Sequence, residues 1–173
     1  MAAKVRILGI DPGSRTTGWG VIESSGHRSV HIAHGCLRIG GDELPARLLA
    51  ILRGLGEVLG EYAPEEVAIE ETFVNRANAA SALVLGQARG AAICAVAGAG
   101  VPIAEYAAAQ VKVAIAGNGR AEKQQVQHMV KILLNLQDKL ASDASDALAV
   151  ALTHAHVRGT RLKAGIALSK AWG

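Results

Sequence analysis

Residues 5–13 read Val-Arg-Ile-Leu-Gly-Ile-Asp-Pro-Gly, an apolar run that ends on a carboxylate and a Pro-Gly turn. A short apolar run of this kind is typical of a buried strand. Two further strand-like runs follow at 17–23 and 30–39, separated by the hairpin-like turn Ser-Ser-Gly-His at 24–27. Because such short connections join antiparallel strands, the three runs predict an antiparallel meander at the start of the chain.

Helical patterns alternate with short strands in the rest of the chain. Leucine and valine at 3.6-residue spacing predict a helix that starts near residues 40–43 and ends at Ala63-Pro64. The other expected elements are a strand at 67–70, a long alanine-rich helix at 78–98 that is apolar on most sides and largely buried, a strand at 101–105, and helices at 107–116, 121–134 and 143–157. This order predicts an α/β domain whose five-stranded mixed sheet has three antiparallel strands, then two parallel ones, with helices on both faces.

Charge is unevenly distributed along the chain. Residues 1–146 hold 14 basic and 15 acidic side chains, whereas residues 147–173 hold four basic side chains and no acid. The net charge of +3 therefore arises from the C-terminal end, and alone it does not identify a nucleic-acid-binding protein. We expect a folded domain over residues 1–158 and a basic, mobile tail over residues 159–173.

Composition argues against several other classes of protein. Half of the residues are hydrophobic, too many for a disordered chain. No run reaches about 18 uncharged apolar residues, and the N-terminus lacks the apolar segment of a signal peptide. Cys36 and Cys94 lie in unrelated contexts, so neither a disulfide framework nor a cysteine zinc site is expected. We therefore expect a cytoplasmic protein with no membrane partner.

Four carboxylates stand at places where they could meet. Asp11 follows the first strand, and Glu70 is the last residue of the apolar strand 67–70. Asp143 and Asp146 lie three residues apart, so both share one face at the start of the last helix. Turn chemistry alone could explain Asp11, and helix capping could explain one of the later aspartates. Glu70 is harder to explain without a partner, because burying a lone carboxylate is costly.

A cluster of carboxylates favours a metal site. Hard oxygen ligands suit Mg²⁺ or Mn²⁺ rather than zinc. Two such ions about 4 Å apart can activate a water and stabilise the leaving oxygen when a phosphodiester is cleaved. The ions would also offset the mutual repulsion of four acids, which would otherwise take up protons. We therefore expect two Mg²⁺ per site, with Mn²⁺ able to substitute.

Five strings carry a resemblance to a known family. They are Gly-Ile-Asp-Pro-Gly-Ser-Arg-Thr-Thr-Gly-Trp-Gly at 9–20, Ala-Ile-Glu-Glu-Thr-Phe at 68–73, Leu-Gly-Gln-Ala-Arg-Gly at 85–90, Ala-Glu-Lys-Gln-Gln-Val-Gln-His-Met-Val at 121–130 and Ser-Asp-Ala-Ser-Asp-Ala-Leu-Ala at 142–149. In this order they closely resemble the RuvC family of bacterial Holliday-junction resolvases. Each string alone is a weak signal, but all five in order, over nearly the whole chain, are highly specific.

The resemblance implies a fold and an activity. The fold would be RNase H-like, and the enzyme a homodimeric, Mg²⁺-dependent crossover junction endodeoxyribonuclease of DNA recombination and repair. It would nick two opposed strands of a four-way DNA junction symmetrically and leave 5′-phosphate and 3′-hydroxyl ends. The family also implies a branch-migration motor, RuvA and RuvB, as a partner.

The resemblance also assigns roles to single residues. The four acids fall on the family's metal-binding catalytic positions. Lys112 and Lys123 resemble family lysines that contact DNA near the cut site, where a lysine can hold a phosphate against the acids. A lysine on a helix surface is, however, more often simply solvated. Arg76, Arg89 and Arg120 are further candidates for contact with the DNA backbone, although Arg89 could equally form a structural ion pair.

Phe73 is the single phenylalanine of the chain and lies just after Glu70 on a polar segment. It could anchor this segment on the core, since phenylalanine is usually buried. It could also stack on, or wedge between, bases at the centre of a junction, because an aromatic face suits an unstacked base. RuvC-like proteins have an aromatic residue here, so we favour contact with DNA.

Three other functions remain open. ATPases of the actin, Hsp70 and sugar-kinase type also begin on Gly-Ile-Asp-x-Gly, but they need two such domains to enclose ATP and this chain has room for one. An RNase H-like nuclease that acts on RNA or on other DNA would have the same metal site. A catalytically idle junction-binding protein would not need all four acids.

Overall fold

Five strands form one mixed sheet in a computed structural model that describes residues 3–26, 28–40, 43–72, 77 and 79–164. The strands are β1 (Val5–Asp11), β2 (Thr16–Ser24), β3 (Ser29–Arg38), β4 (Glu66–Glu70) and β5 (Ile103–Tyr106). Their order is β3-β2-β1-β4-β5, with the first three antiparallel and β4 and β5 parallel to β1. The predicted mixed sheet is confirmed, and it has the RNase H-like arrangement that the resemblance implied.

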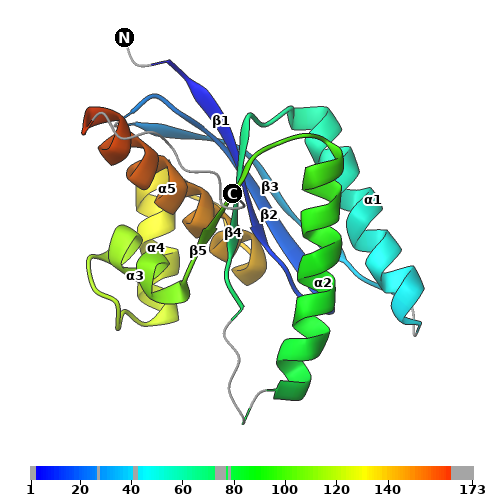
Figure 1. Cartoon of the computed structure of the whole chain (residues 1–173). Helices are drawn as coiled ribbons and strands as arrows, with labels where there is room; N and C mark the ends of the chain where they lie inside the picture. The colour runs from blue at the N-terminus through cyan, green and yellow to red at the C-terminus, as the bar shows by residue number, and fades with distance from the viewer. Residues whose placement is uncertain (1–2, 27, 41–42, 73–76, 78, 165–173) are drawn as a thin grey trace.

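Helices cover both faces of the sheet, as expected (Figure 1). One face carries α1 (Leu44–Tyr62) and α2 (Ala79–Gly98), and the other carries α3 (Ala108–Ala116), α4 (Lys123–Leu134) and α5 (Ser142–Lys163). Successive side chains of a strand point to opposite faces. Leu8 and Ile10 therefore join the core under α1 and α2, whereas Val5 and Ile7 join the core under α4 and α5.

Glycines let α5 lie directly on the backbone of β1 and β2. A Cβ atom added at Gly9 would lie 2.0 Å from the carbonyl oxygen of Ala147, and one added at Gly18 would lie 2.0 Å from that of Asp143. Neither position has room for a side chain, because backbone atoms of α5 occupy the space. Gly18 is also the residue opposite Asp11 in the β1–β2 ladder. The glycines thus bring the start of α5 against the end of β1.

The prediction that the alanine-rich helix is largely buried was wrong. α2 buries one narrow side, formed by small residues such as Ala88 and Ala92, against the sheet and α1. Leu83 is 68% exposed and Val84 is 39% exposed. A uniformly apolar helix has no hydrophobic stripe, so its sequence does not show which side packs and which stays open.

By length and composition, α2 is long and apolar enough to cross a membrane. It is the one such helix in the described part of the chain, and 22% of its most apolar stretch is buried. A single helix of this kind is weak evidence for a span, because core helices of soluble proteins meet the same criterion.

The predicted end of the last helix was also wrong, whereas the predicted domain boundary at residue 158 stays a prediction. α5 continues past Val157 to Lys163. Arg158 is held there by its Nε, which donates to Oε1 of Glu66 at 2.9 Å. Basic side chains in the last turn, including Arg161, also favour the helix because they face the negative end of its dipole. Residues 165–173 of the predicted tail lie outside the described residues.

Candidate functional site

Three aspartates converge where β1 ends and α5 begins. Asp11 is the last residue of β1, and strand alternation turns it to the same face as Gly9, the face that carries α5. Asp143 and Asp146 share one face of α5 because they are three residues apart. One carboxylate oxygen from each residue lies within 4.8 Å of the other two, and all three residues are partly buried. The structure thus brings together three of the four predicted acids.

Glu70 lies beside this three-aspartate cluster rather than within it. It ends β4, the parallel neighbour of β1, and it lines a cleft of about 250 Å³ together with Asp146. Burial and the charge of Asp146 raise the pKa of Glu70, and Glu70 in turn helps to raise the pKa of Asp11. Glu70 is therefore an electrostatic neighbour of the cluster and stands at its rim.

The cluster carries more negative charge than its surroundings balance. Burial raises the pKa of Asp11 from 3.8 to about 7, and the charges of Asp146, Glu70 and Asp143 add to the effect. Burial also raises the pKa of Asp146, against the opposing effect of a hydrogen bond from Lys123. Such mutual repulsion disfavours the ionised acids unless a cation is present.

From the raised pKa of Asp11, which is due first to burial and then to the neighbouring acids, we expect the metal-free protein to lose stability as the pH rises. Between about pH 4 and pH 7 the folded state keeps a proton on Asp11 that the unfolded state has already lost, so stability falls as the pH rises through this window. Asp11→Asn should reduce this pH dependence and raise the free energy of unfolding at pH 8 by roughly 2 kcal/mol. Denaturant unfolding in EDTA at pH 5 and pH 8 measures both changes. An unchanged pH dependence in the variant would contradict the prediction.

Both predicted lysines lie at the site. Lys123, the first residue of α4, donates from its Nζ to Oδ2 of Asp146 at 2.7 Å. Lys112, on α3, lines the same cleft as Lys123 and Glu70. The side chain of Lys123 is 61% exposed, so its ammonium is open to a group that enters from solvent.

The predicted arginines and Phe73 have different outcomes. Arg120 is exposed in the turn before α4, where its backbone N–H donates to Oδ1 of Asn118 at 2.9 Å, and it is not among the described residues that line the cleft. Phe73 and Arg76 lie outside the described residues, so their roles stay predictions. Arg89 forms an ion pair with Glu105 on β5, which is the structural alternative that the sequence had left open.

A groove next to Glu70 was missed by the sequence analysis. It measures about 450 Å³ and is lined by residues from the end of β4, from α2 and from the start of α3. Its polar lining includes Glu71, Thr72 and Ser81. The residues that line the groove come from three separate segments, 70–72, 81–85 and 107–109, with no shared periodicity, so only tertiary packing brings them together.

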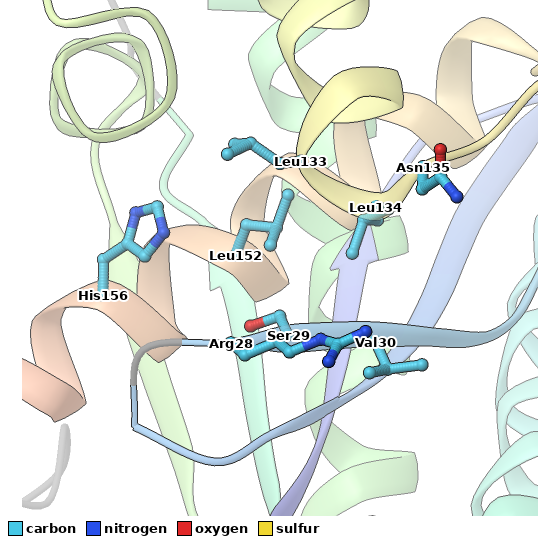
Figure 2. Close-up of a pocket in the computed structure, with 8 residues that line it drawn as sticks. All are labelled: Arg28, Ser29, Val30, Leu133, Leu134, Asn135, Leu152 and His156. Atoms are coloured by element: carbon cyan, nitrogen blue, oxygen red, sulfur yellow. The ribbon is translucent and has the colours of Figure 1, made fainter.

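A separate hollow of about 350 Å³ lies at the other end of the sheet (Figure 2). Its lining consists of Arg28, Ser29, Val30, Leu133, Leu134, Asn135, Leu152 and His156. Ser29 pairs with Ser24, which pairs with Val5 at the start of β1, whereas Asp11 is at its end. No carboxylate is among the described residues that line this hollow, so it does not belong to the acidic site.

Comparisons with known proteins identify the family. The family model described as crossover junction endodeoxyribonuclease RuvC matches residues 7–154. Curated proteins with that name are similar over nearly their whole length. The one from Xanthomonas oryzae pv. oryzae is 56% identical over 169 residues, which is 96% of this chain and 97% of the relative. The one from Stenotrophomonas maltophilia is 54% identical over 170 residues, which is 97% of this chain and 98% of the relative.

Solved structures agree with the sequence comparisons. RuvC of T. thermophilus in complex with a Holliday junction substrate matches with a TM-score of 0.83 and 36% identity, covering 90% of this chain and 96% of that one. The yeast mitochondrial Holliday junction resolvase Ydc2 matches with a TM-score of 0.65 and 12% identity, covering 92% of this chain and 82% of that one, which shows a shared fold alone. With the family model and curated relatives in agreement, the chain belongs to the RuvC family of crossover junction endodeoxyribonucleases.

Proposed function

We propose that this chain resolves four-way DNA junctions by hydrolysing one phosphodiester in each of two opposed strands. The observation that carries the proposal is the convergence of Asp11, Asp143 and Asp146 beside a cleft that also holds Glu70. The match to a RuvC in complex with a Holliday junction substrate supports a junction as the DNA that enters this cleft. The products would carry 5′-phosphate and 3′-hydroxyl ends, as in the family.

The donor set fits hard divalent cations, and we propose Mg²⁺. Three carboxylate oxygens within 4.8 Å of one another can approach a common ion with small side-chain movements. A cation would also relieve the repulsion that raises the pKa of Asp11. Glu70, at the rim, would complete the set. Asp11, Asp143, Asp146 and Glu70 would hold two such ions, whose charge would supply an activated water and stabilisation of the leaving oxygen.

The lysines would hold the phosphate. The ammonium of Lys123 now donates to Asp146, and a phosphate oxygen that enters the cleft offers it an equivalent charged acceptor. Lys112, which lines the same cleft and whose charge acts on Glu70, would contact the same or the adjoining phosphate. These contacts would orient the scissile bond over the acids, which is the main protein contribution to this chemistry besides the acids themselves. Further along the strand we propose contacts from Arg76 and Arg120, with Phe73 stacked on a base.

We also propose that the chain acts as a homodimer. Each chain carries one acidic cluster among its described residues, so two symmetric cuts call for two copies. α2 offers a surface for the second copy, since Leu83 is 68% exposed. Gly86 and Gly90 lie on the same side at helical spacing and have open space around them, which lets another helix approach closely. A RuvA and RuvB motor as partner and a location in the cytoplasm follow from the family and stay proposals.

A cleavage assay on matched substrates tests the function. With Mg²⁺, and without ATP, the protein should nick a synthetic four-way junction at symmetric positions on two opposed strands. A linear duplex of the same sequence should stay intact, and EDTA should abolish the cuts. Equal cutting of an RNA–DNA hybrid would instead favour a general RNase H-like nuclease, and ATP hydrolysis without nicking would favour the ATPase alternative.

A further inference from the structure

We propose that Arg89 is a positioning residue that holds Glu70 in place from the opposite face of the sheet, and thereby sets the affinity of the acidic site for its divalent cation. The inference rests on the proposed role of Glu70 as a metal ligand. Arg89 would then affect cation binding at the acidic site, which an ion pair with a purely structural role would not do.

Arg89 joins the ends of two strands. From α2, its Nη2 pairs with the carboxylate of Glu105 on β5, and its Nε donates to the backbone carbonyl oxygen of Glu70 at 3.4 Å. Glu105 pairs with Ile69 across the β4–β5 ladder, and Ile69 belongs to the core under α2. One guanidinium therefore fixes the last residue of β4 to the end of β5.

The side chain of Glu70 points the other way. Ala68 packs in the core under α5, and strand alternation gives Glu70, two residues later, the same direction. Arg89 thus donates to the backbone of Glu70 from one face of the sheet, while the Glu70 carboxylate points to the other face, where the aspartates lie. This division leaves the carboxylate free to bind a cation.

Glu70 needs such support more than the three aspartates do. Asp143 and Asp146 sit on a long helix packed on the sheet, and Asp11 ends a seven-residue strand that lies between β2 and β4 and pairs with Gly18 of β2. Glu70 is the last paired residue of a five-residue strand. A small rotation of this strand end would move its carboxylate away from the cluster, and misplacement by about 1 Å can cost a catalytic group most of its effect.

The Arg89–Glu105 pair is shielded enough to hold this position. Its side chains are 17% and 20% exposed, so water and salt screen the attraction only in part. Removing one partner of such a pair leaves the other charge half-buried without compensation. The loss of Arg89 should therefore let the strand end shift, rather than merely remove a surface contact.

The chain offers a matched control at the other end of the same strand. Arg158 on α5 pairs with Glu66, the first residue of β4, and these side chains are 18% and 16% exposed. Arg158→Gln breaks an arginine–glutamate pair of nearly equal exposure on β4, but at the end remote from Glu70. A purely structural role for Arg89 predicts that both variants lose some stability and that both keep the Mn²⁺ affinity of the wild type.

The experiment compares Mn²⁺ binding and stability in Arg89→Gln and Arg158→Gln. Calorimetric titration of the DNA-free protein with Mn²⁺ should show a dissociation constant about 10-fold higher in Arg89→Gln and within about 2-fold of wild type in Arg158→Gln. Thermal melting temperatures should fall in both variants, and by less in Arg158→Gln, because Glu66 keeps its contact with Nε2 of His154 at 2.6 Å. The Mg²⁺ concentration for half-maximal junction cleavage should rise in Arg89→Gln alone.

Two further variants keep the proposal testable if Arg89→Gln folds poorly. Glu105→Gln removes the ion pair but leaves the Nε donor, and Arg89→Lys keeps the charge but loses the fork geometry, so both should weaken Mn²⁺ binding in the same direction. Equal Mn²⁺ affinity in Arg89→Gln, Glu105→Gln and Arg158→Gln would overturn the proposal. Mn²⁺ binding that is also insensitive to Asp11→Asn would instead overturn the proposed metal site itself.

Discussion

Replacing Asp11 with asparagine should lower the rate of junction cleavage by about 1,000-fold or more, which corresponds to roughly 4 kcal/mol of lost transition-state stabilisation. Asp11 stands at the centre of the electrostatic network, since Asp146, Glu70 and Asp143 all act on its pKa. Asparagine keeps the shape of the side chain but removes the charge that would hold a cation. The variant should fold at least as well as wild type, because the repulsion among the acids is reduced.

Junction binding should survive this change. The proposed DNA contacts come from basic side chains such as Lys112 and Lys123, and removing a nearby negative charge does not weaken them. Gel-shift titration in EDTA, beside cleavage in Mg²⁺, separates the two properties. Glu57→Gln is a suitable control, since it removes the same charge from an exposed position on α1, across the sheet. Binding lost together with cleavage would contradict the assignment of Asp11 to catalysis.

Enlarging Gly18 by one methyl group should damage both stability and activity. The added Cβ would lie 2.0 Å from the carbonyl oxygen of Asp143 and 2.3 Å from its carbonyl carbon. These are backbone atoms of the first turn of α5, so the helix itself must move. We expect Gly18→Ala to lower the free energy of unfolding by about 3 kcal/mol. Cleavage should fall by about 100-fold in the protein that remains folded, because Asp143 and Asp146 move with the helix.

Gly56→Ala provides the comparison for this prediction. Gly56 is exposed to solvent and lies away from both ends of α1, and an added Cβ there would meet nothing within 4 Å. The same substitution should therefore raise stability there by about 0.5 kcal/mol, since alanine favours the helix. Urea unfolding and single-turnover cleavage at a temperature where both variants are folded measure the two effects. Wild-type cleavage by Gly18→Ala would show that the helix start tolerates displacement.

The sheet could be predicted from the sequence because its signals are local. Apolar runs at 5–10, 17–23 and 30–39 with short turns between them allow little besides a meander, and the later strands are bounded by long helical patterns. Burial of α2 could not be predicted, since alanine and glycine give no hydrophobic stripe. The end of α5 was missed because its last turns are polar and are held by Arg158, whose partner Glu66 is 92 residues away.

The acids of the site could be predicted for a different reason. Asp11 and Glu70 end parallel neighbouring strands, and parallel strand ends meet at one edge of a sheet. Sequence spacing placed Asp143 and Asp146 on one helix face, but it held no information on distance. It therefore could not separate Glu70 at the rim from the three aspartates within 4.8 Å of one another. The pairing of Arg89 with Glu105 depends equally on tertiary packing.

The direct backbone contact between α5 and the first two strands fixes the separation of the acids in the proposed active site. At Gly9 and Gly18 the backbone of the strands contacts the backbone of α5 directly. A change of side-chain rotamer therefore cannot compensate for a shift that separates Asp11 from the aspartates of α5. The two faces of the sheet should therefore differ in how well the residues beneath their helices tolerate substitution. Larger side chains beneath α1 and α2 would leave this separation unchanged. Any added bulk beneath α5 would change the distance between Asp11 and the aspartates of α5.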